Sequence, residues 1–260
     1  MLALFGSGDR RSWPRMTRAY EHFHDPVAAY DHLAPEFPAF CKRRELYLRA
    51  VERQIVIRIP GDAQSLLDIG AADGTRAMRI AAGAKIARVV LVEPSPGMLS
   101  AAPNATELWR MKGENLDPEV INERFDVITC LWNVLGHVLS AGRLRVLKAA
   151  AQLLSAHGKI FVDVNHRYNA RSYGLLATCA RWTKDTMNRT SQTGDVTVAW
   201  NLGTKNISTY GHVFRHREIM RLADTAGLEL EQRIIVDYQD GSLHRLSWCG
   251  NLLYVFRRSS

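Results

Sequence analysis

Acidic residues and glycines alternate between Asp68 and Gly74, and this spacing indicates a binding site for a ligand that carries positive charge. Asp68 lies two residues before Gly70, and Asp73 directly precedes Gly74. Glycines in such a turn let backbone N–H groups and the N-terminus of the following helix approach a ligand closely. Two carboxylates are poor neighbours for a pyrophosphate, so the pattern disfavours a dinucleotide.

A further acidic residue, Glu93, follows the apolar run 89–92. In nucleotide-binding α/β folds, a carboxylate after the second strand accepts hydrogen bonds from both ribose hydroxyls. Glu93 stands where that carboxylate is expected. The two acidic positions together predict a ligand that combines a ribose with a cationic group.

An alternation of strands and helices must position these residues. The apolar patterns predict strands at 66–70, 88–93, 107–112, 125–131 and 159–164, separated by helices at 75–83, 96–102, 117–122 and 141–155. A helix at 215–226 and a strand pair at 228–238 and 246–257 follow them. Strands that alternate with helices imply parallel pairing through right-handed crossovers, so the sequence predicts an α/β fold.

Five segments in this order resemble the motifs of class I S-adenosylmethionine (SAM)-dependent methyltransferases of the small-molecule type. The segments are 65–75, 89–95, 112–116, 125–133 and 153–163. The resemblance implies a Rossmann-like sheet of seven strands in the order 3-2-1-4-5-7-6. It also implies SAM as the cofactor and S-adenosylhomocysteine as the product. One departure is Ala72, which stands where the family has its central glycine and implies a less close backbone contact.

The resemblance also implies which residues bind the cofactor. They come from the glycine turn, from the ends of the second, third and fourth strands, and from the residues that follow them. The implied residues are Asp68, Gly70, Ala72, Gly74, Glu93, Pro94, Met98, Glu114, Asn115, Cys130, Leu131 and Trp132.

Residues 1–60 are expected to form an N-terminal tail, to about residue 15, and a helical cover, while 61–260 form the methyltransferase domain. The segment Ala29–Ala34 resembles the Tyr-Asp-x-Leu-Ala element that covers SAM and the acceptor in small-molecule methyltransferases, which implies that Tyr30 lines the site, with Tyr20 as a second candidate. The alternative is that these aromatic rings only pack on the sheet. A helix over 45–59 is expected to bury Leu46, Leu48, Val51, Ile55 and Ile59.

The segment 166–212 is too long for a simple crossover, and we expect it to be an insertion that builds the acceptor pocket. It contains a helical stretch to about residue 188. Two β-rich segments follow at 196–202 and 207–214, joined by a turn at Gly203 and Thr204.

Methyl transfer is an in-line displacement, so the protein must align the reactants, and an oxygen acceptor of high pKa also needs a base. His137 is the leading candidate for that base, with His166 and Tyr30 as further catalytic candidates. The alternative for His137 is a partly buried histidine without a chemical role. The residues expected to bind substrate follow the fourth and fifth strands or lie in the cover: Tyr20, Asn133, Arg167, Tyr168 and Arg171.

The chain of 260 residues has a net charge of +8, and much of the excess lies in one region. Nine Lys or Arg residues between positions 143 and 189 stand against two acidic residues. This region either faces the acceptor or forms a solvated surface. The favoured function is methyl transfer to nitrogen or oxygen of a small, possibly anionic, acceptor in metabolite or natural-product biosynthesis.

Several alternatives remain open. The basic region suggests methylation of RNA or another nucleic acid, although the signatures of adenine-amino and cytosine-C5 methylation are absent from 125–133. A SAM-binding protein without activity is a third possibility, and an NAD-dependent oxidoreductase is the least favoured.

Single cysteines at 41, 130, 179 and 249 have no metal-binding spacing, so no metal site is expected. No apolar run is long enough to span a bilayer, and the first residues do not resemble a signal peptide. We therefore expect a cytoplasmic protein without a membrane partner, either a monomer or a homodimer.

Overall fold

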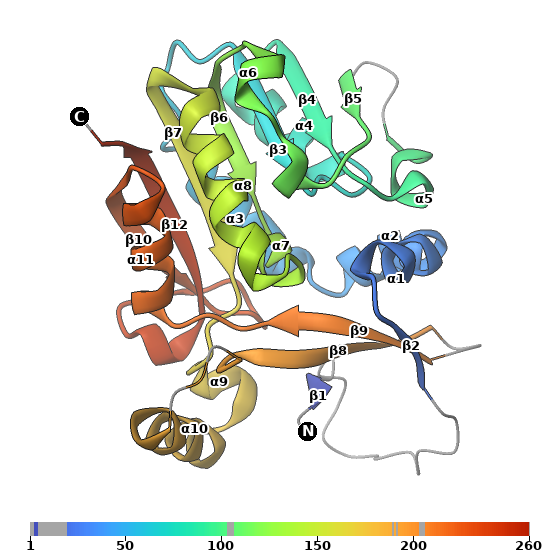
Figure 1. Cartoon of the computed structure of the whole chain (residues 1–260), viewed down its shortest axis with the longest axis vertical. Coiled ribbons are helices and arrows are strands. Elements are labelled where there is room, and N and C mark those ends of the chain that lie inside the picture. Colours follow the sequence, from blue (N-terminus) through green and yellow to red (C-terminus); the bar gives the residue numbers. More distant parts are fainter. Residues whose placement is uncertain are drawn as a thin grey trace.

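The computed structural model describes residues 20–102, 107–188, 190, 192–202 and 206–259, together with the backbone of residues 3 and 4. Within these residues, eight strands form a central sheet in the order β11-β10-β12-β7-β6-β3-β4-β5 (Figure 1). The strands are β3 (Ser65–Ile69), β4 (Arg88–Val92), β5 (Glu107–Trp109), β6 (Phe125–Cys130), β7 (Leu154–Val164), β10 (Leu228–Val236), β11 (Leu243–His244) and β12 (Asn251–Arg258).

The strand pairing confirms the predicted Rossmann-like sheet. From β5 to β7 the five strands are parallel, and β12 and β10 pair in the antiparallel direction at one end. Numbered by their order in the chain, these seven strands run 3-2-1-4-5-7-6. The two-residue strand β11 extends the sheet beyond the expected edge.

Both faces of the sheet are covered, as a parallel sheet requires. In β3, Leu66 packs into the core with α3 (Glu45–Val56) and α4 (Thr75–Ala84), whereas Leu67 packs with α8 (Ser140–Leu153) and α11 (His216–Thr225). In Figure 1, α8 lies in front of the sheet and α3 behind it. The expectation that Leu46 is buried is wrong, since it is 64% exposed, and α3 ends at Val56 rather than at Ile59.

The short elements around the sheet differ from their predicted bounds. Helices α5 (Pro96–Leu99) and α6 (Pro118–Ile121) end earlier than predicted. Asn122 follows α6, and its left-handed backbone conformation stops the helix. Strand β7 begins five residues earlier than expected because Leu154 pairs with Phe125 of β6. The 3₁₀ turns lie at Ala34–Glu36, Gly113–Asn115 and Ser247–Cys249.

A second sheet lies below the carboxyl ends of the central strands in Figure 1. Its order is β1-β8-β9-β2, with the strands β1 (Ala3–Leu4), β2 (Tyr20–Phe23), β8 (Asp195–Asn201) and β9 (Asn206–His212). The sequence predicted β8 and β9 but not β2, which pairs with β9 in the parallel direction. The predicted turn at Gly203 and Thr204 lies outside the described residues, as does the predicted tail apart from β1.

Helices from the N-terminal segment and from the segment 166–188 complete this region. The N-terminal helices α1 (Pro26–Leu33) and α2 (Phe37–Lys42) share a hydrophobic cluster with Trp200 and Ile207 of the second sheet. The segment 166–188 forms α9 (Ala170–Tyr173) and α10 (Leu175–Met187), which lie below the β8–β9 pair in Figure 1. Within the described ranges, no helix has the length and apolar character needed to cross a bilayer.

Candidate functional site

A pocket of about 400 Å³ opens at the carboxyl ends of β3, β4 and β6. Two layers enclose it, because α1 and α2 contribute residues to one wall and the short helix α7 (Val134–His137) contributes to another. The predicted site residues that line it are Tyr30, Asp68, Gly70, Ala72, Glu93, Pro94, Glu114, Leu131, Trp132 and His137. In an open α/β sheet, this end of the strands is where ligands bind.

The turn after β3 is held in a conformation that brings its backbone close to the pocket. Gly70 has a φ of +73°, and a Cβ there would stand 2.4 Å from a methyl carbon of Val134. Ala72 also has a positive φ, +51°, which is costly for a residue with a side chain. Its N–H donates to Oε2 of Glu93 at 3.0 Å, so the carboxylate stabilises this conformation.

Glu93 and Asp68 are buried carboxylates with few hydrogen bonds. Glu93 accepts from the N–H groups of Ala72 and Ser95, and burial raises the pKa of its carboxyl to about 7. Asp68 accepts from the Thr129 hydroxyl at 2.6 Å, and burial raises its pKa to about 6. A ligand that brings hydrogen-bond donors or positive charge would stabilise the ionised form of each carboxylate.

Tyr30 and His137 meet across the pocket. Nδ1 of His137 lies 3.1 Å from the carbonyl oxygen of Tyr210, so Nδ1 must carry the proton and donate it. Nε2 is then free to accept the hydrogen bond of the Tyr30 hydroxyl at 3.0 Å. Burial lowers the pKa of His137 to about 4 and raises the pKa of Tyr30, so both side chains are neutral.

Trp132 reaches the pocket from a strained turn. Trp132 and Asn133 follow β6 with φ values of +57° and +64°. The carboxylate of Asp163 accepts from the N–H of Trp132 at 3.0 Å, and the Asp163 carbonyl accepts from the N–H of Asn133 at 2.9 Å. The Trp132 ring stacks on Phe40 of α2 with 5.3 Å between ring centroids. The turn therefore fixes an aromatic surface between the sheet and the cover.

Asn133 supports this turn and does not line the pocket. Its Oδ1 accepts from the N–H of Asn165, and its Nδ2 donates to the carbonyl of His212, each at 3.0 Å. These contacts tie the end of β6 to the end of β9. Asn133 was expected to bind substrate, and the structure places it behind the pocket wall.

Other predicted substrate and catalytic residues also lie outside the pocket. Arg167 and Tyr168 both bond to the Asp185 carboxylate, and Arg171 pairs with Asp237. His166 is buried with Nδ1 2.7 Å from the carbonyl of Ser247, and burial lowers its pKa to about 4. Tyr20 lies in β2 and is also outside the pocket.

Four predicted cofactor residues are close to the pocket in sequence but are not part of its lining: Gly74, Met98, Asn115 and Cys130. Gly74 precedes α4, with a φ of +71°. Met98 packs in the cluster beneath α1, and Cys130 is buried at the end of β6. Among the described residues, no three His, Cys, Asp or Glu side chains are grouped so that they could hold a metal ion.

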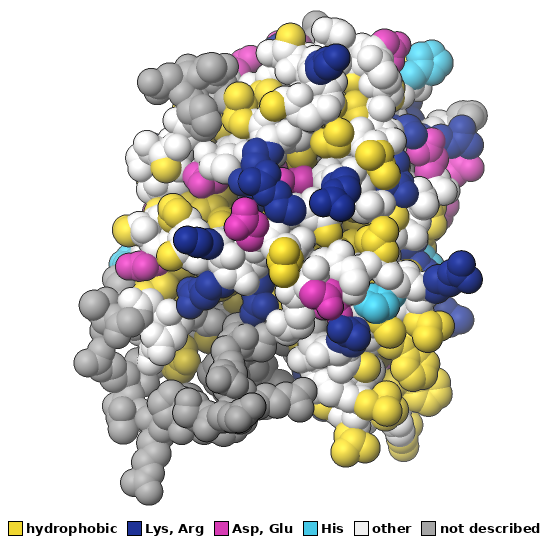
Figure 2. All heavy atoms as spheres, turned by 180° about the vertical axis from the view of Figure 1, so that it is seen from behind, with side chains coloured by type: hydrophobic (Ala, Val, Ile, Leu, Met, Phe, Trp, Pro, Cys, Tyr) yellow, Lys and Arg dark blue, Asp and Glu magenta, His cyan; other side chains and the backbone are white. Residues whose placement is uncertain are grey.

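Part of the basic region is neutralised or buried, while Arg145, Lys148 and Lys184 are exposed. Lys159 pairs with Glu231 at 2.9 Å, and the two arginines named above each pair with an aspartate. Arg143 is buried, and Arg189 lies outside the described residues. Figure 2 shows the face opposite to α8, and there Lys and Arg side chains are interspersed with Asp and Glu.

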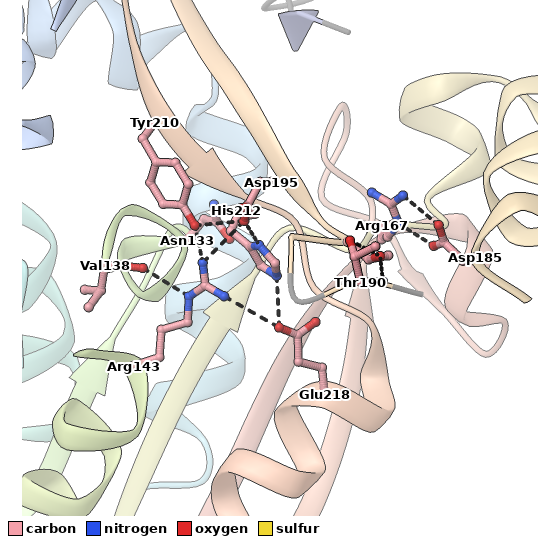
Figure 3. Close-up of polar contacts among 11 residues, drawn as sticks. Asn133, Val138, Arg143, Arg167, Asp185, Thr190, Asp195, Tyr210, His212 and Glu218 are labelled. Atoms are coloured by element: carbon pink, nitrogen blue, oxygen red, sulfur yellow. Dashed lines mark hydrogen bonds and ion pairs between the residues drawn. The ribbon is translucent and has the colours of Figure 1, made fainter. Parts of the chain in front are cut away.

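Arg143 instead forms a buried polar cluster (Figure 3). Its guanidinium donates to the Val138 carbonyl at 3.0 Å and to the Tyr210 hydroxyl at 2.5 Å. His212 lies between two carboxylates, with Nδ1 2.6 Å from Asp195 and Nε2 3.0 Å from Glu218. Because Tyr210 also presents its carbonyl to His137, this cluster joins α8, β8, β9 and α11 directly to the pocket wall.

Among the residues in or beside the pocket that were not predicted, two make informative contacts. Asp31 of α1 accepts from the Ser95 hydroxyl and from the N–H of Gly97 at 3.0 Å, which ties α1 to the loop after Glu93. It lies next to Tyr30 in the covering element, which was the available signal. Arg76 lines the pocket from the first turn of α4. The N-terminal end of a helix is the positive end of its dipole, so a cation there is unfavourable unless an anion accompanies it. This was the sequence signal for an anionic partner.

Residues 39–233 match the family model described as a methyltransferase domain. No curated protein sequence matches the chain. The sugar N-methyltransferase KedS8 from Streptoalloteichus sp. is a similar solved structure, with 18% identity, a TM-score of 0.56, and coverage of 86% of this chain and 93% of KedS8.

Two further structures share the fold. The glycopeptide N-methyltransferase MtfA, complexed with SAM, is 12% identical, with a TM-score of 0.56 and coverage of 80% of this chain and 86% of MtfA. A Haloferax volcanii methyltransferase, in complex with the Trm112 methyltransferase activator, is 15% identical, with a TM-score of 0.62 and coverage of 90% and 97%.

Proposed function

This chain belongs to the class I SAM-dependent methyltransferases, and we propose that its acceptor is a small molecule methylated on nitrogen or oxygen in metabolite or natural-product biosynthesis. The observation that carries this proposal is one pocket that is lined both by the Tyr30–His137 pair and by the carboxylates Asp68 and Glu93. A pocket of about 400 Å³ under a helical cover suits small reactants. Two of the structural neighbours are named as N-methyltransferases of a sugar and of a glycopeptide.

The bound cofactor supplies a methyl group on a sulfonium, which a nucleophile displaces in line. Glu93 would accept hydrogen bonds from the ribose, and Asp68 would face the cationic end of the cofactor. Trp132 would form the surface on which the reactants are aligned, and the cover would exclude water. We propose that residues 1–60 act as this cover and that the insertion at 166–212 completes the acceptor pocket.

The Tyr30–His137 pair bears on which atom is methylated. A proton leaving the acceptor would pass to the Tyr30 oxygen while the Tyr30 proton moves to Nε2 of His137. Because burial holds the pKa of His137 at about 4, this pair is a weak base. That favours an amine that arrives neutral over a hydroxyl of high pKa.

Methylation of nucleic acid has less support. Binding to phosphates needs several cations that share one surface. In the predicted basic region, Lys159, Arg167 and Arg171 are each paired with a carboxylate and Arg143 is buried. Exposed cations such as Arg145, Lys148 and Lys184 remain, but they are fewer than the sequence count suggests.

Calorimetric titration with S-adenosylhomocysteine tests cofactor binding, with Glu93→Ala as the comparison. Micromolar binding by the wild type that is lost in the variant is expected. The wild type is then incubated with methyl-deuterated SAM and either matched amines and alcohols or total RNA, and deuterated products are identified by mass spectrometry. Labelled product from amines supports the proposal. Labelling of RNA, with none of any small molecule, would overturn the proposed acceptor class.

A further inference from the structure

Arg76 is a buried cation of the pocket whose hydrogen-bonding groups are not satisfied by the described residues. Its side chain is 13% exposed, and its Nε and Nη2 atoms are buried without a hydrogen-bond partner in the part of the chain that the structure describes. A buried N–H of a charged group that lacks an acceptor costs more than a neutral one. The guanidinium therefore lacks an acceptor that a bound molecule would supply.

The nearby carboxylate of Glu52 does not fill this role. Its Oε1 is 4.0 Å from Nε of Arg76, which is too far for a hydrogen bond. Glu52 is engaged by Arg79, whose Nε donates to Oε2 at 2.9 Å and whose Nη2 donates to Oε1. Lys112, the other described Lys or Arg side chain in the pocket lining, donates to Asp25 at 3.2 Å.

The position of Arg76 indicates which part of a ligand it meets. It stands in the first turn of α4, directly after the glycine turn, and its guanidinium lies 5.9 Å from the centre of the Trp132 ring. Glu93 follows β4, whereas Trp132 follows β6 on the other side of β3. Arg76 thus faces the region beyond the nucleoside, where the cofactor's amino-acid end and the acceptor meet.

We propose that Arg76 binds a carboxylate group inside the pocket, an inference that rests on the proposed function. Nε–H and Nη2–H lie on one edge of a guanidinium and form the fork that accepts both oxygens of a carboxylate. Two bound molecules can present one: the amino-acid end of the cofactor and an acidic acceptor. The shared chemistry is a carboxylate held bidentately, which would offset the cost of burying the arginine.

The first arm of the test compares two ligands that differ by the carboxylate alone. S-adenosylhomocysteine and S-adenosyl-3-thiopropylamine, which keeps the amine, are titrated into the wild type and Arg76→Gln. If the cofactor is the source, the variant loses roughly tenfold to a hundredfold in affinity for S-adenosylhomocysteine. Its affinity for the decarboxylated analogue stays within about twofold.

The second arm tests an acidic acceptor. Protein saturated with S-adenosylhomocysteine is titrated with benzoate and with benzamide, its neutral counterpart, followed by ligand-observed NMR. If the acceptor is the source, benzoate binds the wild type more tightly than it binds Arg76→Gln, while benzamide binds both equally. The proposal is overturned if Arg76→Gln matches the wild type for S-adenosylhomocysteine and benzoate binding to the wild type is absent or no tighter than to the variant.

Two further variants serve as controls for these results. Lys85→Gln removes an exposed cation at the end of the same helix that does not line the pocket, so its ligand affinities should equal those of the wild type. Arg76→Lys keeps the charge but loses the fork, so it should recover only part of the affinity. Thermal unfolding confirms that each variant is folded. A wild type that binds no S-adenosylhomocysteine would overturn the proposed function instead, so the two failures are distinguishable.

Discussion

In the proposed site, Glu93 should make cofactor binding depend on pH. Burial raises its pKa to about 7, above the 4.5 of an ordinary glutamate, and the charged form accepts hydrogen bonds from two hydroxyls more strongly than the neutral form. Affinity for S-adenosylhomocysteine should therefore fall by about tenfold between pH 8 and about pH 6.

The measurement is calorimetry across that range, with Glu93→Gln as the comparison. The variant should bind more weakly at high pH and lose the part of the pH dependence centred near 7, while the part due to Asp68, with its pKa of about 6, remains. Identical slopes in wild type and variant would show that Glu93 does not titrate in this range.

His137 makes folding stability depend on pH, and here too the loss comes as the pH falls. An unfolded histidine has a pKa of 6.5, and burial lowers the value in the folded protein to about 4. Between these values the unfolded chain binds a proton that the folded chain does not, so stability is lost as the pH falls. For one such histidine the loss between pH 6.5 and about pH 5 is roughly 2 kcal/mol.

Urea unfolding at those two pH values checks this, with His137→Gln as the comparison. Glutamine keeps an acceptor for the Tyr30 hydroxyl but does not titrate. The variant should therefore lose about 2 kcal/mol less than the wild type over the same interval. His166, whose pKa is also lowered to about 4, contributes equally to both proteins. Equal losses in both would contradict the burial-shifted pKa of His137.

Single residues differ in how far the sequence could identify them. Asp68, Gly70 and Glu93 were predictable because each lies at the end of a strong apolar run. In a parallel α/β sheet, ligands bind at the carboxyl ends of the strands. The contact between Tyr30 and His137 was not, since it joins side chains 107 positions apart whose geometry depends on packing. Arg167 and Arg171 were misplaced because sequence position after a strand does not show which acidic side chain a long cation will reach.

At the scale of elements, the buried cluster around Arg143 holds the insertion against the core. Arg143→Met would leave the Val138 carbonyl and the Asp195 and Glu218 carboxylates without their cation. Loss of one partner of a buried ionic group costs about 3 to 5 kcal/mol. We expect a decrease of that size in the free energy of unfolding, measured in urea.

Arg145→Met provides the control, because Arg145 lies on the same helix but is exposed. Its effect should stay within about 0.5 kcal/mol. A similar loss in both variants would mean that helix propensity or net charge, rather than the cluster, accounts for the change.

The second sheet was only half predictable at this scale. The alternating pattern at 196–202 and 207–214 was sufficient to predict β8 and β9, because an antiparallel pair has a local sequence signature. Strand β2 has four residues and pairs in parallel with β9, 186 positions away, as the contact between His22 and Ser208 shows. Such a short strand depends on its partner for stability, so its own sequence carries little signal.

For the whole molecule, the strand order of the central sheet predicts which backbone amides are the most protected from hydrogen exchange. Strands β3 and β6 lie in its interior, with β6 paired to β3 and β7 on either side, whereas β5 and β11 lie at its two edges. Hydrogen exchange followed by mass spectrometry should show the slowest exchange in 65–69 and 125–130 and much faster exchange in 107–109. Equal protection of β5 and β3 would contradict this layering.

The overall architecture was predictable because five motifs in a fixed order leave few alternative topologies. Family resemblance supplied the strand order, which periodicity alone does not give. What could not be predicted was how the excess charge is distributed in space. The sum over residues 143–189 is strongly positive, but the fold brings Asp237 to Arg171 and Glu231 to Lys159 from elsewhere in the chain.

The carbonyl that holds the His137 ring belongs to β9, within the insertion expected to shape the acceptor pocket. Protein engineers commonly exchange such segments between homologues to change substrate preference. Here a transplanted hairpin would bring its own backbone carbonyl, or none, to Nδ1 of the histidine. A chimera would then alter the tautomer of the ring along with the shape of the cavity. In the proposed mechanism, one segment would therefore affect both acceptor specificity and proton transfer. A donor hairpin should be chosen for its match at position 210 before its match in size.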